Sequence, residues 1–330
     1  MFDDQNNNNQ SEPFTLKTEN KNESYLILKI TLTIILVLSL TLVPIFFIYH
    51  TNDELNFLVV SDVHEDYDKL DKLVKKLSNK KFEYVLFLGD FLDPLGTHSQ
   101  IKTDEDLKKV EKIVKKLEEI APVLYVGGNH DPGRMFTDEK PIETDLDKSK
   151  NLHKNFQKIK DDLYIVGIGG STPILYNSQY SILEKPFESL DFNNNFSKGF
   201  PYDDPNYNKS DLQLNETLQE ILSKFSDVNT SIILMSHAGP LYSYTSVQNL
   251  TEEYPIGYLG SLNLFNSFVL NEKIFLNVHG HTHPSRGRYN YYEDKTILNP
   301  GALATSYYAT MIINKKDGKY NVKTTFEDLD

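Results

Sequence analysis

Residues 56–64 read NFLVVSDVH, a short apolar run that ends in polar residues. Its apolar part is short and rich in branched residues, which is typical of a buried strand. Asp62 and His64 follow directly, separated by one residue. Alternate side chains of an extended strand point the same way, so both can reach one centre. The stretch therefore predicts a buried strand with two metal-ligand side chains at its carboxyl end.

Four later apolar runs end in residues of the same chemical kind. The runs and the residues after them are 84–89 with Asp90, 123–128 with Asn129 and His130, 231–236 with His237, and 274–278 with His281 and His283. Ligands bind outside the carboxyl ends of strands in α/β sheets, so these distant side chains could converge. A lone aspartate there usually caps a helix, and a lone histidine usually lies in the core or at the surface. Five strand ends in order favour one shared site.

The segments between the first runs have helical periodicity. Apolar residues recur every three or four positions at 70–77 and 107–120, with lysine and glutamate on the opposite face of the second segment. Strand–helix alternation followed by β-rich sequence predicts an α/β core of layered sheets in one domain. Further helices and irregular loops are expected along the chain: helices near 212–225 and 261–270, loops at 171–210 and 238–259.

The candidate ligands offer only oxygen and nitrogen, and the chain has no cysteine. Such donors suit zinc, manganese or iron, and they do not suit Cu(I) or an iron–sulfur cluster. Glycines at 89, 128 and 280 stand directly before ligand positions, where they allow tight turns and close backbone approach.

These motifs resemble those of the calcineurin-like metallophosphoesterase superfamily. The matching pieces are, in order, Asp62-x-His64, Gly89-Asp90, Gly128-Asn129-His130-Asp131, His237, and Gly280-His281-x-His283. The resemblance covers about residues 56–310, and TILNPGA at 296–302 is similar to the small, single-domain branch. Glu65 stands where many members have glycine. The resemblance implies a four-layered α/β/β/α sandwich.

The resemblance also implies a dinuclear metal centre that hydrolyses phosphomonoesters or phosphodiesters. Its two divalent or mixed-valence ions would come from manganese, iron and zinc. By resemblance, Asp90 bridges both ions, and the other ligands divide into two sets: Asp62, His64 and His283 for one, and Asn129, His237 and His281 for the other. His130 is implied as a catalytic residue beside the phosphate. Asp131 either orients His130 or caps the following turn.

The amino-terminal part differs in composition from the rest. Residues 1–24 are polar and are expected to form a disordered head. Residues 30–49, ITLTIILVLSLTLVPIFFIY, carry no charge, and about twenty apolar residues span a ~30 Å hydrocarbon layer. We expect a transmembrane signal-anchor helix at 25–49 before the metallophosphoesterase domain at 50–330. A cleaved signal peptide is the alternative, but bulky residues stand where small ones belong.

The lysines near this span predict its orientation. Lys17, Lys21 and Lys29 lie on its amino-terminal side, and no lysine or arginine follows until Lys69. The head is therefore expected in the cytoplasm and the large domain in the lumen or outside. Five glycosylation sequons lie on the far side, at Asn195, Asn208, Asn215, Asn229 and Asn249, and chance alone gives about as many.

The net charge of the chain limits the kinds of partner that it can bind. The 34 basic and 47 acidic residues give a formal net charge of −13, which argues against a non-specific nucleic-acid binder. A phosphoester remains an expected substrate, because metal ions can supply the positive charge. Two other functions stay open: a non-catalytic interaction scaffold on the same fold, and a phosphodiesterase that acts on lipids or glycolipids.

Several further residues have weaker motif context. His279 is expected to point away from the site, and His50, His98 and His153 are expected at the surface. Arg134 either reaches a substrate phosphate or lies in a solvated loop. Four tyrosines could line a substrate wall or be incidental in a chain with 20 of them: Tyr242, Tyr244, Tyr254 and Tyr258.

Overall fold

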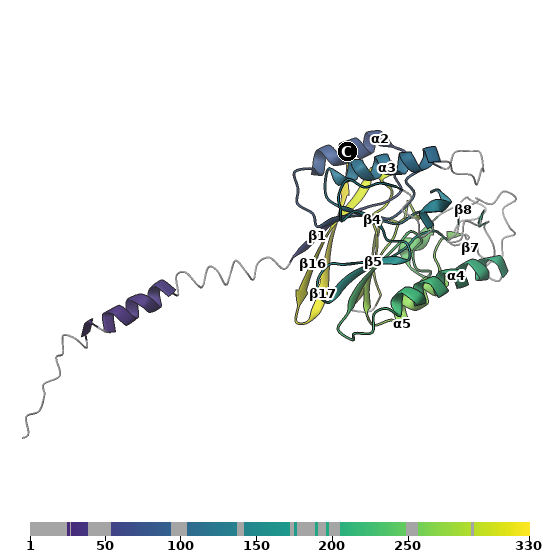
Figure 1. The fold of residues 1–330 in the computed structure, drawn as a ribbon. Coiled ribbons are helices and arrows are strands. Elements are labelled where there is room, and N and C mark those ends of the chain that lie inside the picture. Colours follow the sequence, from purple (N-terminus) through teal and green to yellow (C-terminus); the bar gives the residue numbers. More distant parts are fainter. Residues whose placement is uncertain are drawn as a thin grey trace, which may run out of the picture. The chain divides into compact units, whose positions relative to one another are not determined.

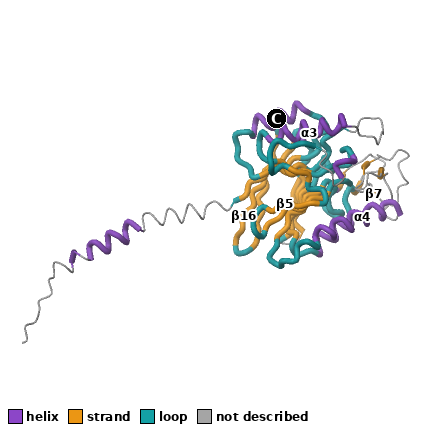
Figure 2. Tube along the Cα trace, in the orientation of Figure 1, coloured by secondary structure: helices purple, strands orange, loops and turns teal. Residues whose placement is uncertain are grey.

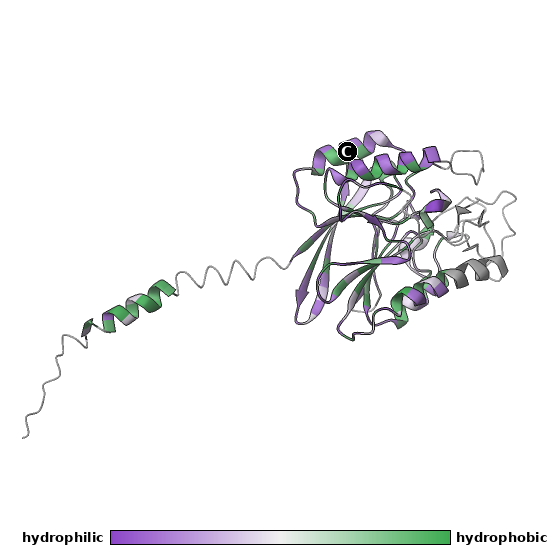
Figure 3. Ribbon diagram, in the orientation of Figure 1, coloured by the Kyte–Doolittle hydropathy of each residue, from purple (hydrophilic) through white to green (hydrophobic). Residues whose placement is uncertain are grey.

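The chain divides into two units, Met1–Asp53 and Glu54–Asp330, in a computed structural model. The structure describes residues 25–26, 28–38, 54–93, 104–136, 142–171, 175–176, 189–190, 196–197, 205–248, 257–291 and 294–330. In the first unit, residues 28–38 are helical and mostly hydrophobic (Figure 3). Over the described residues, no helix has the length and apolar character that a membrane crossing demands. The expected head at 1–24 and residues 27 and 39–49 of the expected span lie outside the described residues.

Two six-stranded sheets form the centre of the second unit (Figure 1). The first has the order β17-β16-β1-β2-β3-β4. Its strands are β1 (Leu55–Val60), β2 (Tyr84–Phe87), β3 (Val123–Tyr125), β4 (Lys150–Asn151), β16 (Tyr307–Lys316) and β17 (Lys319–Asp328). Strands β1 to β4 run parallel, whereas β16 and β17 form an antiparallel edge. The parallel strands are those whose carboxyl ends bear Asp62, Asp90 and Asn129.

The second sheet has the order β14-β15-β13-β10-β6-β5. Its strands are β5 (Asn155–Lys158), β6 (Leu163–Ile168), β10 (Ser231–Ser236), β13 (Ile274–Val278), β14 (Gly287–Tyr291) and β15 (Lys295–Asn299). The four central strands are parallel and the two edge strands antiparallel. Five short strands pair outside these sheets: β7 (Leu175–Tyr176), β8 (Ser189–Leu190), β9 (Phe196–Ser197), β11 (Val247–Gln248) and β12 (Gly257–Tyr258).

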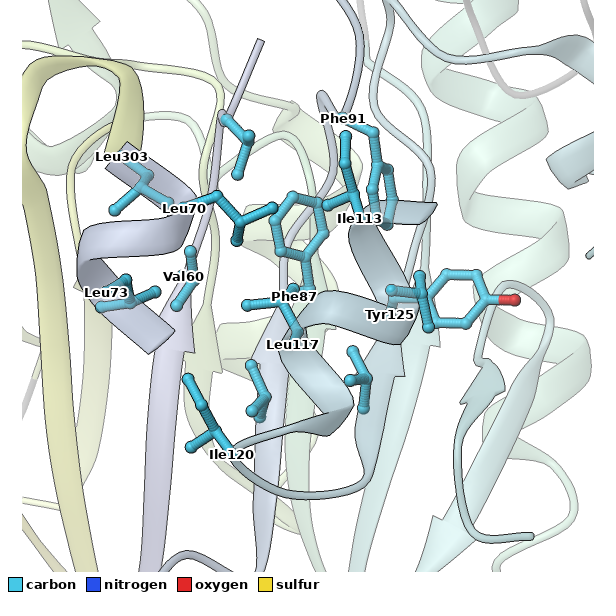
Figure 4. Packing of buried hydrophobic residues seen from close by; sticks show 14 of the residues in the cluster. Val60, Leu70, Leu73, Phe87, Phe91, Ile113, Leu117, Ile120, Tyr125 and Leu303 are labelled. Atoms are coloured by element: carbon cyan, nitrogen blue, oxygen red, sulfur yellow. The ribbon is translucent and has the colours of Figure 1, made fainter. Parts of the chain in front are cut away.

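Helices cover the outer faces of both sheets (Figures 1 and 2). Helices α2 (Tyr67–Leu77) and α3 (Asp104–Glu118) share one buried cluster with the first sheet, which Figure 4 shows at Leu70, Phe87 and Ile113. Helices α4 (Pro205–Leu222) and α5 (Leu262–Leu270) share another with the second sheet. A third cluster fills the space between the sheets. The layers are thus helices, sheet, sheet and helices, and the predicted α/β core of layered sheets is confirmed.

Local sequence explains where these helices begin. Asp66 precedes α2 and its carboxylate accepts the backbone N–H of Lys69, a standard amino-terminal cap. The apolar residues of α2 and α3 at three- and four-residue spacing are the buried ones. Helix α4 begins at Pro205, inside the segment expected to be an irregular loop. Proline is favourable in the first turn of a helix. It has no backbone N–H, and an N–H in that turn would have no partner within the helix.

Candidate metal centre

Two groups of possible metal ligands meet at the carboxyl ends of the parallel strands. The ligand atoms within each group all lie within 4.8 Å of one another. One group contains Asp62, His64, Asp90 and His283, and the other contains Asp90, His237 and His281. Asp90 belongs to both groups, so its carboxylate can serve two neighbouring ions. Each group takes side chains from both sheets.

The first group is held together by short contacts among its own side chains. His283 Nε2 lies 3.1 Å from Asp62 Oδ1 and 3.1 Å from His64 Nε2. His64 Nδ1–H donates to the carbonyl of Leu92 at 2.9 Å, which leaves Nε2 facing the group. A second hydrogen bond of this kind fixes the ring orientation of metal-binding histidines.

Asn129 lies beside the second group and offers an amide oxygen to it. Its Oδ1 lies 2.9 Å from His237 Nε2, which lies 3.3 Å from Asp90 Oδ2. His237 Nδ1–H donates to the carbonyl of Leu88 at 2.7 Å, so this ring is also fixed with Nε2 inward. His281 Nε2 is buried and has no hydrogen-bond partner within the described part of the chain. A buried ring nitrogen without a partner is a candidate metal ligand.

The charges of the two groups depend on one another. Burial alone would raise the pKa of Asp62, but the charge and hydrogen bond of His283 outweigh it and hold that pKa at about 2. Burial would likewise raise the pKa of Asp90, but His237 and His130 hold it well below its usual range. Burial lowers the pKa of His237, yet Asp90 prevails and raises it to about 9. Both buried carboxylates are therefore anionic and face ring nitrogens.

Several ligand positions have left-handed backbone conformations. The φ angles are 55° at Asp62, 47° at His64, 55° at Asp90 and 66° at His281, and Glu65 also has 57°. Residues other than glycine rarely adopt this region, and its cost is of order 1–3 kcal/mol each. Backbone bonds hold the strained turns, such as that from the N–H of Asp62 to the carbonyl of Gly89 at 3.0 Å. Strain of this kind clusters at functional sites, so these turns are candidates for one.

Glycine is required beside two of these turns. A Cβ at Gly128 would lie 2.1 Å from Asp90 Oδ1, and one at Gly280 would lie 1.8 Å from Ser61 Oγ. The backbone itself thus packs against the carboxylate that both groups share. The glycines expected to allow close approach do so at these positions.

Asp131 shapes the loop that carries Asp90. Its buried carboxylate accepts four backbone N–H groups: Asp90 at 3.0 Å, Phe91 at 2.9 Å, Leu92 at 3.3 Å and Gly128 at 2.7 Å. It therefore does more than cap its own turn, and its acceptors are occupied by backbone rather than by His130. Sequence reasoning missed this role, because bonds to backbone 40 residues away leave no pattern in the sequence.

His130 lies beside the shared carboxylate. Its backbone N–H donates to Asp90 Oδ1 at 2.9 Å, and its Nε2 lies 3.7 Å from Asp90 Oδ2. Its side chain is 23% exposed, so the ring lies at the edge of the ligand groups and is accessible to solvent. Burial lowers the pKa of His130 and outweighs the charge of Asp90.

The other sequence-predicted residues lie apart from the ligand groups. His279 points away, as expected, and its Nε2 lies 2.8 Å from Thr245 Oγ1. His153 is buried, so the expectation of a surface position is wrong: Nδ1 accepts the N–H of Gly169 at 2.9 Å, and the ring packs against Phe136. Arg134 Nη1 pairs with Asp104 at 2.6 Å. Three expected positions lie outside the described residues: His50, His98 and Tyr254.

Fold and side chains together define a class of protein: two facing sheets with clustered metal-ligand side chains at the carboxyl ends of their parallel strands. A sequence model of the calcineurin-like phosphoesterase family matches residues 55–285, more than half of the chain. The chain therefore belongs to the calcineurin-like phosphoesterase family, which confirms the resemblance seen in its motifs.

Solved structures share the fold at low sequence identity. One crystal structure aligns with 84% of this chain and 100% of its own, with 15% identity and a TM-score of 0.53. The protein TT1561 of Thermus thermophilus aligns over 83% of this chain and 99% of its own, with 14% identity and a TM-score of 0.50. Phosphopantetheinyl hydrolase of Mycobacterium tuberculosis aligns over 76% of this chain and 91% of its own, with 14% identity and a TM-score of 0.44. No curated protein sequence matches the chain significantly.

Proposed function

We propose that this protein hydrolyses phosphomonoesters or phosphodiesters with two bound metal ions. The observation that carries the proposal is the pair of ligand groups that share Asp90. Membership of the calcineurin-like phosphoesterase family supports a hydrolase. In the proposed arrangement, Asp90 would hold both ions, and the remaining ligands would divide into two sets: Asp62, His64 and His283 for one, and Asn129, His237 and His281 for the other.

The side chains fit such ions on chemical grounds. Two fully buried carboxylates are costly unless cations neutralise them, and here their neighbours are ring nitrogens. His281 Nε2 is buried without a hydrogen-bond partner in the described ranges, so it has a lone pair to offer. Oxygen and nitrogen donors of this kind suit manganese, iron or zinc.

The ions would supply Lewis-acid stabilisation of the phosphoryl oxygens and lower the pKa of a water that attacks phosphorus. The chain's own residues perform the other tasks. Asp62 and Asp90 provide the negative charge that holds the ions, and Asp131 fixes the loop of Asp90 through backbone N–H groups. The ring of His130, at the border of the site, donates a hydrogen bond to the phosphoryl group or a proton to the leaving oxygen.

The test measures metal content and turnover on the full-length protein in detergent. Wild-type protein should bind about two metal equivalents and hydrolyse an aryl phosphate or an aryl phosphodiester. Asp90→Asn and His281→Ala should lose metal, and turnover should fall by at least about a hundredfold. Asp161→Asn, in an exposed turn, is the matched control. If both site variants hydrolyse like wild type, the proposed site is wrong.

The same experiment, with lipid phosphodiesters and soluble nucleotides added as substrates, separates this enzyme from the two other functions. A non-catalytic scaffold would fold yet show neither bound metal nor turnover. A phosphodiesterase directed at lipids or glycolipids would hydrolyse lipid phosphodiesters faster than soluble nucleotides. We favour the general hydrolase, because every ligand position of the family motif is occupied by a residue that can bind metal.

We also propose that residues 25–49 anchor the protein in a membrane, with residues 1–24 in the cytoplasm and 50–330 in the lumen or outside. The charge-free run at 30–49 and the lysines on its amino-terminal side support this. Protease added to sealed vesicles should spare the large domain, and its digestion would reverse the orientation.

A further inference from the structure

The last residue of β15, Asn299, has a buried side chain that makes three hydrogen bonds to the backbone. Its amide Nδ2 donates to the carbonyls of Thr282 at 2.9 Å and Thr245 at 3.1 Å, and its Oδ1 accepts the N–H of Gly301 at 2.8 Å. A carboxamide has two hydrogens to donate and one oxygen to accept, so both of its polar atoms are bonded. The reversed amide would place its oxygen against two carbonyls, so these bonds fix its orientation.

One of these bonds reaches the turn that carries two ligand histidines. Thr282 stands between them and is fully buried. Its N–H donates to the carbonyl of Gly280 at 2.7 Å, and its carbonyl accepts the N–H of Ser285 at 3.1 Å as well as the amide of Asn299. His281 in this turn has a φ of 66°, which is costly for a residue other than glycine. A strained turn keeps its shape only when its surroundings hold it, and Asn299 is one of the groups that hold this turn.

The bond to the amide oxygen reaches the segment that supports the other ligand turn. Gly301, which donates this bond, begins that segment. The N–H of Leu303 donates to the carbonyl of Ser61 at 2.8 Å, and the N–H of Ala304 donates to the carbonyl of Asp62 at 3.0 Å. Asp62 also has a left-handed backbone conformation, with a φ of 55°. The same amide thus bonds directly to the histidine turn and, through the segment after Gly301, supports the turn of Asp62.

The two turns meet at the carboxylate of Asp62. Its Oδ2 accepts the backbone N–H of His281 at 3.1 Å, and its Oδ1 lies 3.1 Å from His283 Nε2. Asp62 and His283 both belong to the first ligand group. Asp62 follows β1 of the first sheet and His283 follows β13 of the second, so the distance between their ligand atoms depends on how the two turns are held.

We propose that Asn299 is a positioning residue of the metal centre, which holds the turn of His281 and His283 in register with the turn of Asp62. This rests on the proposed function, because the spacing of these side chains matters for an ion that binds between them. Asn299 is not itself a ligand, since its amide is bonded to backbone. Side chains that orient metal ligands change metal affinity by about 10–100-fold when they are replaced. Asn299 therefore acts on metal affinity as well as on stability.

The test measures Mn²⁺ binding to the metal-free, full-length protein in detergent by titration calorimetry. Asn299→Ala removes all three bonds, whereas Asn299→Asp keeps the shape and the acceptor for Gly301, but its ionised carboxylate has no hydrogen for the two carbonyls. Both variants should raise the Kd for Mn²⁺ by about tenfold or more. Urea unfolding of each metal-free variant shows that it folds, and Asn299→Asp carries the comparison if Asn299→Ala does not fold.

Lys295→Met is the matched control, because Lys295 is the first residue of the same strand and its Nζ also donates to three backbone carbonyls. None of these carbonyls belongs to a ligand turn. Lys295→Met should lower stability and leave the Kd for Mn²⁺ at the wild-type value. The positioning role is overturned if the Asn299 variants bind Mn²⁺ like wild type, or if Lys295→Met weakens binding as much as they do. A wild-type protein that binds no Mn²⁺ would reject the proposed function itself, and this inference with it.

Discussion

Asp131 is not a candidate metal ligand, yet the geometry of the candidate metal centre depends on its side chain. Its carboxylate accepts backbone N–H groups from both the Asp90 loop and the Gly128 turn. These turns come from neighbouring strands β2 and β3, and both are needed to place Asp90 and Asn129. The geometry of two ligands is thus set by an aspartate buried behind them.

We predict that Asp131→Asn destabilises the fold by about 2–4 kcal/mol, because the amide nitrogen would face N–H donors and leave them unpaired. The measurement is urea unfolding of the metal-free protein. Asp131→Asn should also bind metal more weakly than wild type. Asp161→Asn, whose carboxylate lies in an exposed turn, should unfold like wild type; equal stability of Asp131→Asn would contradict the role assigned here.

At His237, a proton would compete with the proposed metal ion. The carboxylate of Asp90 raises the pKa of His237 to about 9, above the usual value for histidine. Its ion pair with Asp90 therefore stabilises the metal-free fold fully below about pH 6.5, and this contribution is lost as the pH rises toward 9. A metal ligand must be neutral, so the same proton opposes metal binding over that range.

We accordingly predict that metal affinity rises with pH between about 6.5 and 9, by up to about tenfold per unit for each proton displaced. Titration calorimetry in buffers of different ionisation enthalpy should detect proton release near the middle of this range. Affinity that stays flat over this range, with no proton release, would show that His237 is already neutral in the metal-free protein.

At the scale of elements, a buried lysine joins strand β15 to helix α5. Lys295 Nζ donates to the carbonyls of Phe268 at 2.8 Å, Asn271 at 2.8 Å and Ile274 at 2.7 Å. The last carbonyls of a helix lack intrahelical partners, so the ammonium group satisfies the end of α5 and the start of β13 together. Burial lowers the pKa of Lys295, and the negative charges of Asp294 and Glu272 oppose that shift only in part.

Lys295→Met should lower the free energy of unfolding by about 2–4 kcal/mol, because buried carbonyls lose a charged donor. The change is measured by urea unfolding. Metal content should stay at the wild-type level, since α5 lies outside the ligand groups. Lys80→Met, at an exposed position, provides the control, and a Lys295→Met protein as stable as that control would contradict the prediction.

Strands and their ends were the most predictable elements. Short apolar runs that end in Asp62, Asp90 or His237 predict two things. The apolar residues predict a buried strand, and the polar residue at the end predicts a candidate ligand position. His153 had no such mark: it follows a two-residue strand, β4, and it is buried with its ring against Phe136 and its Nδ1 bonded to the N–H of Gly169. The start of α4 was also hidden, because a polar sequence after Pro205 can form either a loop or a helix.

At the scale of the whole molecule, the motif order predicted which strand ends converge, and the two sheets explain how. Side chains from the ends of β1 and β2 meet those from the ends of β10 and β13 across the space between the sheets. The links between loops could not be predicted, because Asn299 reads as one polar residue at the end of an apolar strand. Only the folded chain reveals that its amide joins Thr245 to Thr282.

We predict that metal binding stabilises the whole of the second unit. Ions that bind only the folded state should add about 2.7 kcal/mol at a free concentration about one hundred times Kd. Thermal unfolding with and without a chelator measures this difference. His281→Ala should show a smaller response to added metal than wild type, and an identical response would place the stabilising ions elsewhere on the protein.

The shared position of Asp90 has a consequence for motion. Because each ligand group takes side chains from both sheets, an ion held by either group would cross-link the two sheets at this edge. Removing the ions should therefore loosen the packing of one sheet against the other there. Hydrogen exchange of the backbone N–H groups of β1 and β13, with and without a chelator, would measure that loosening.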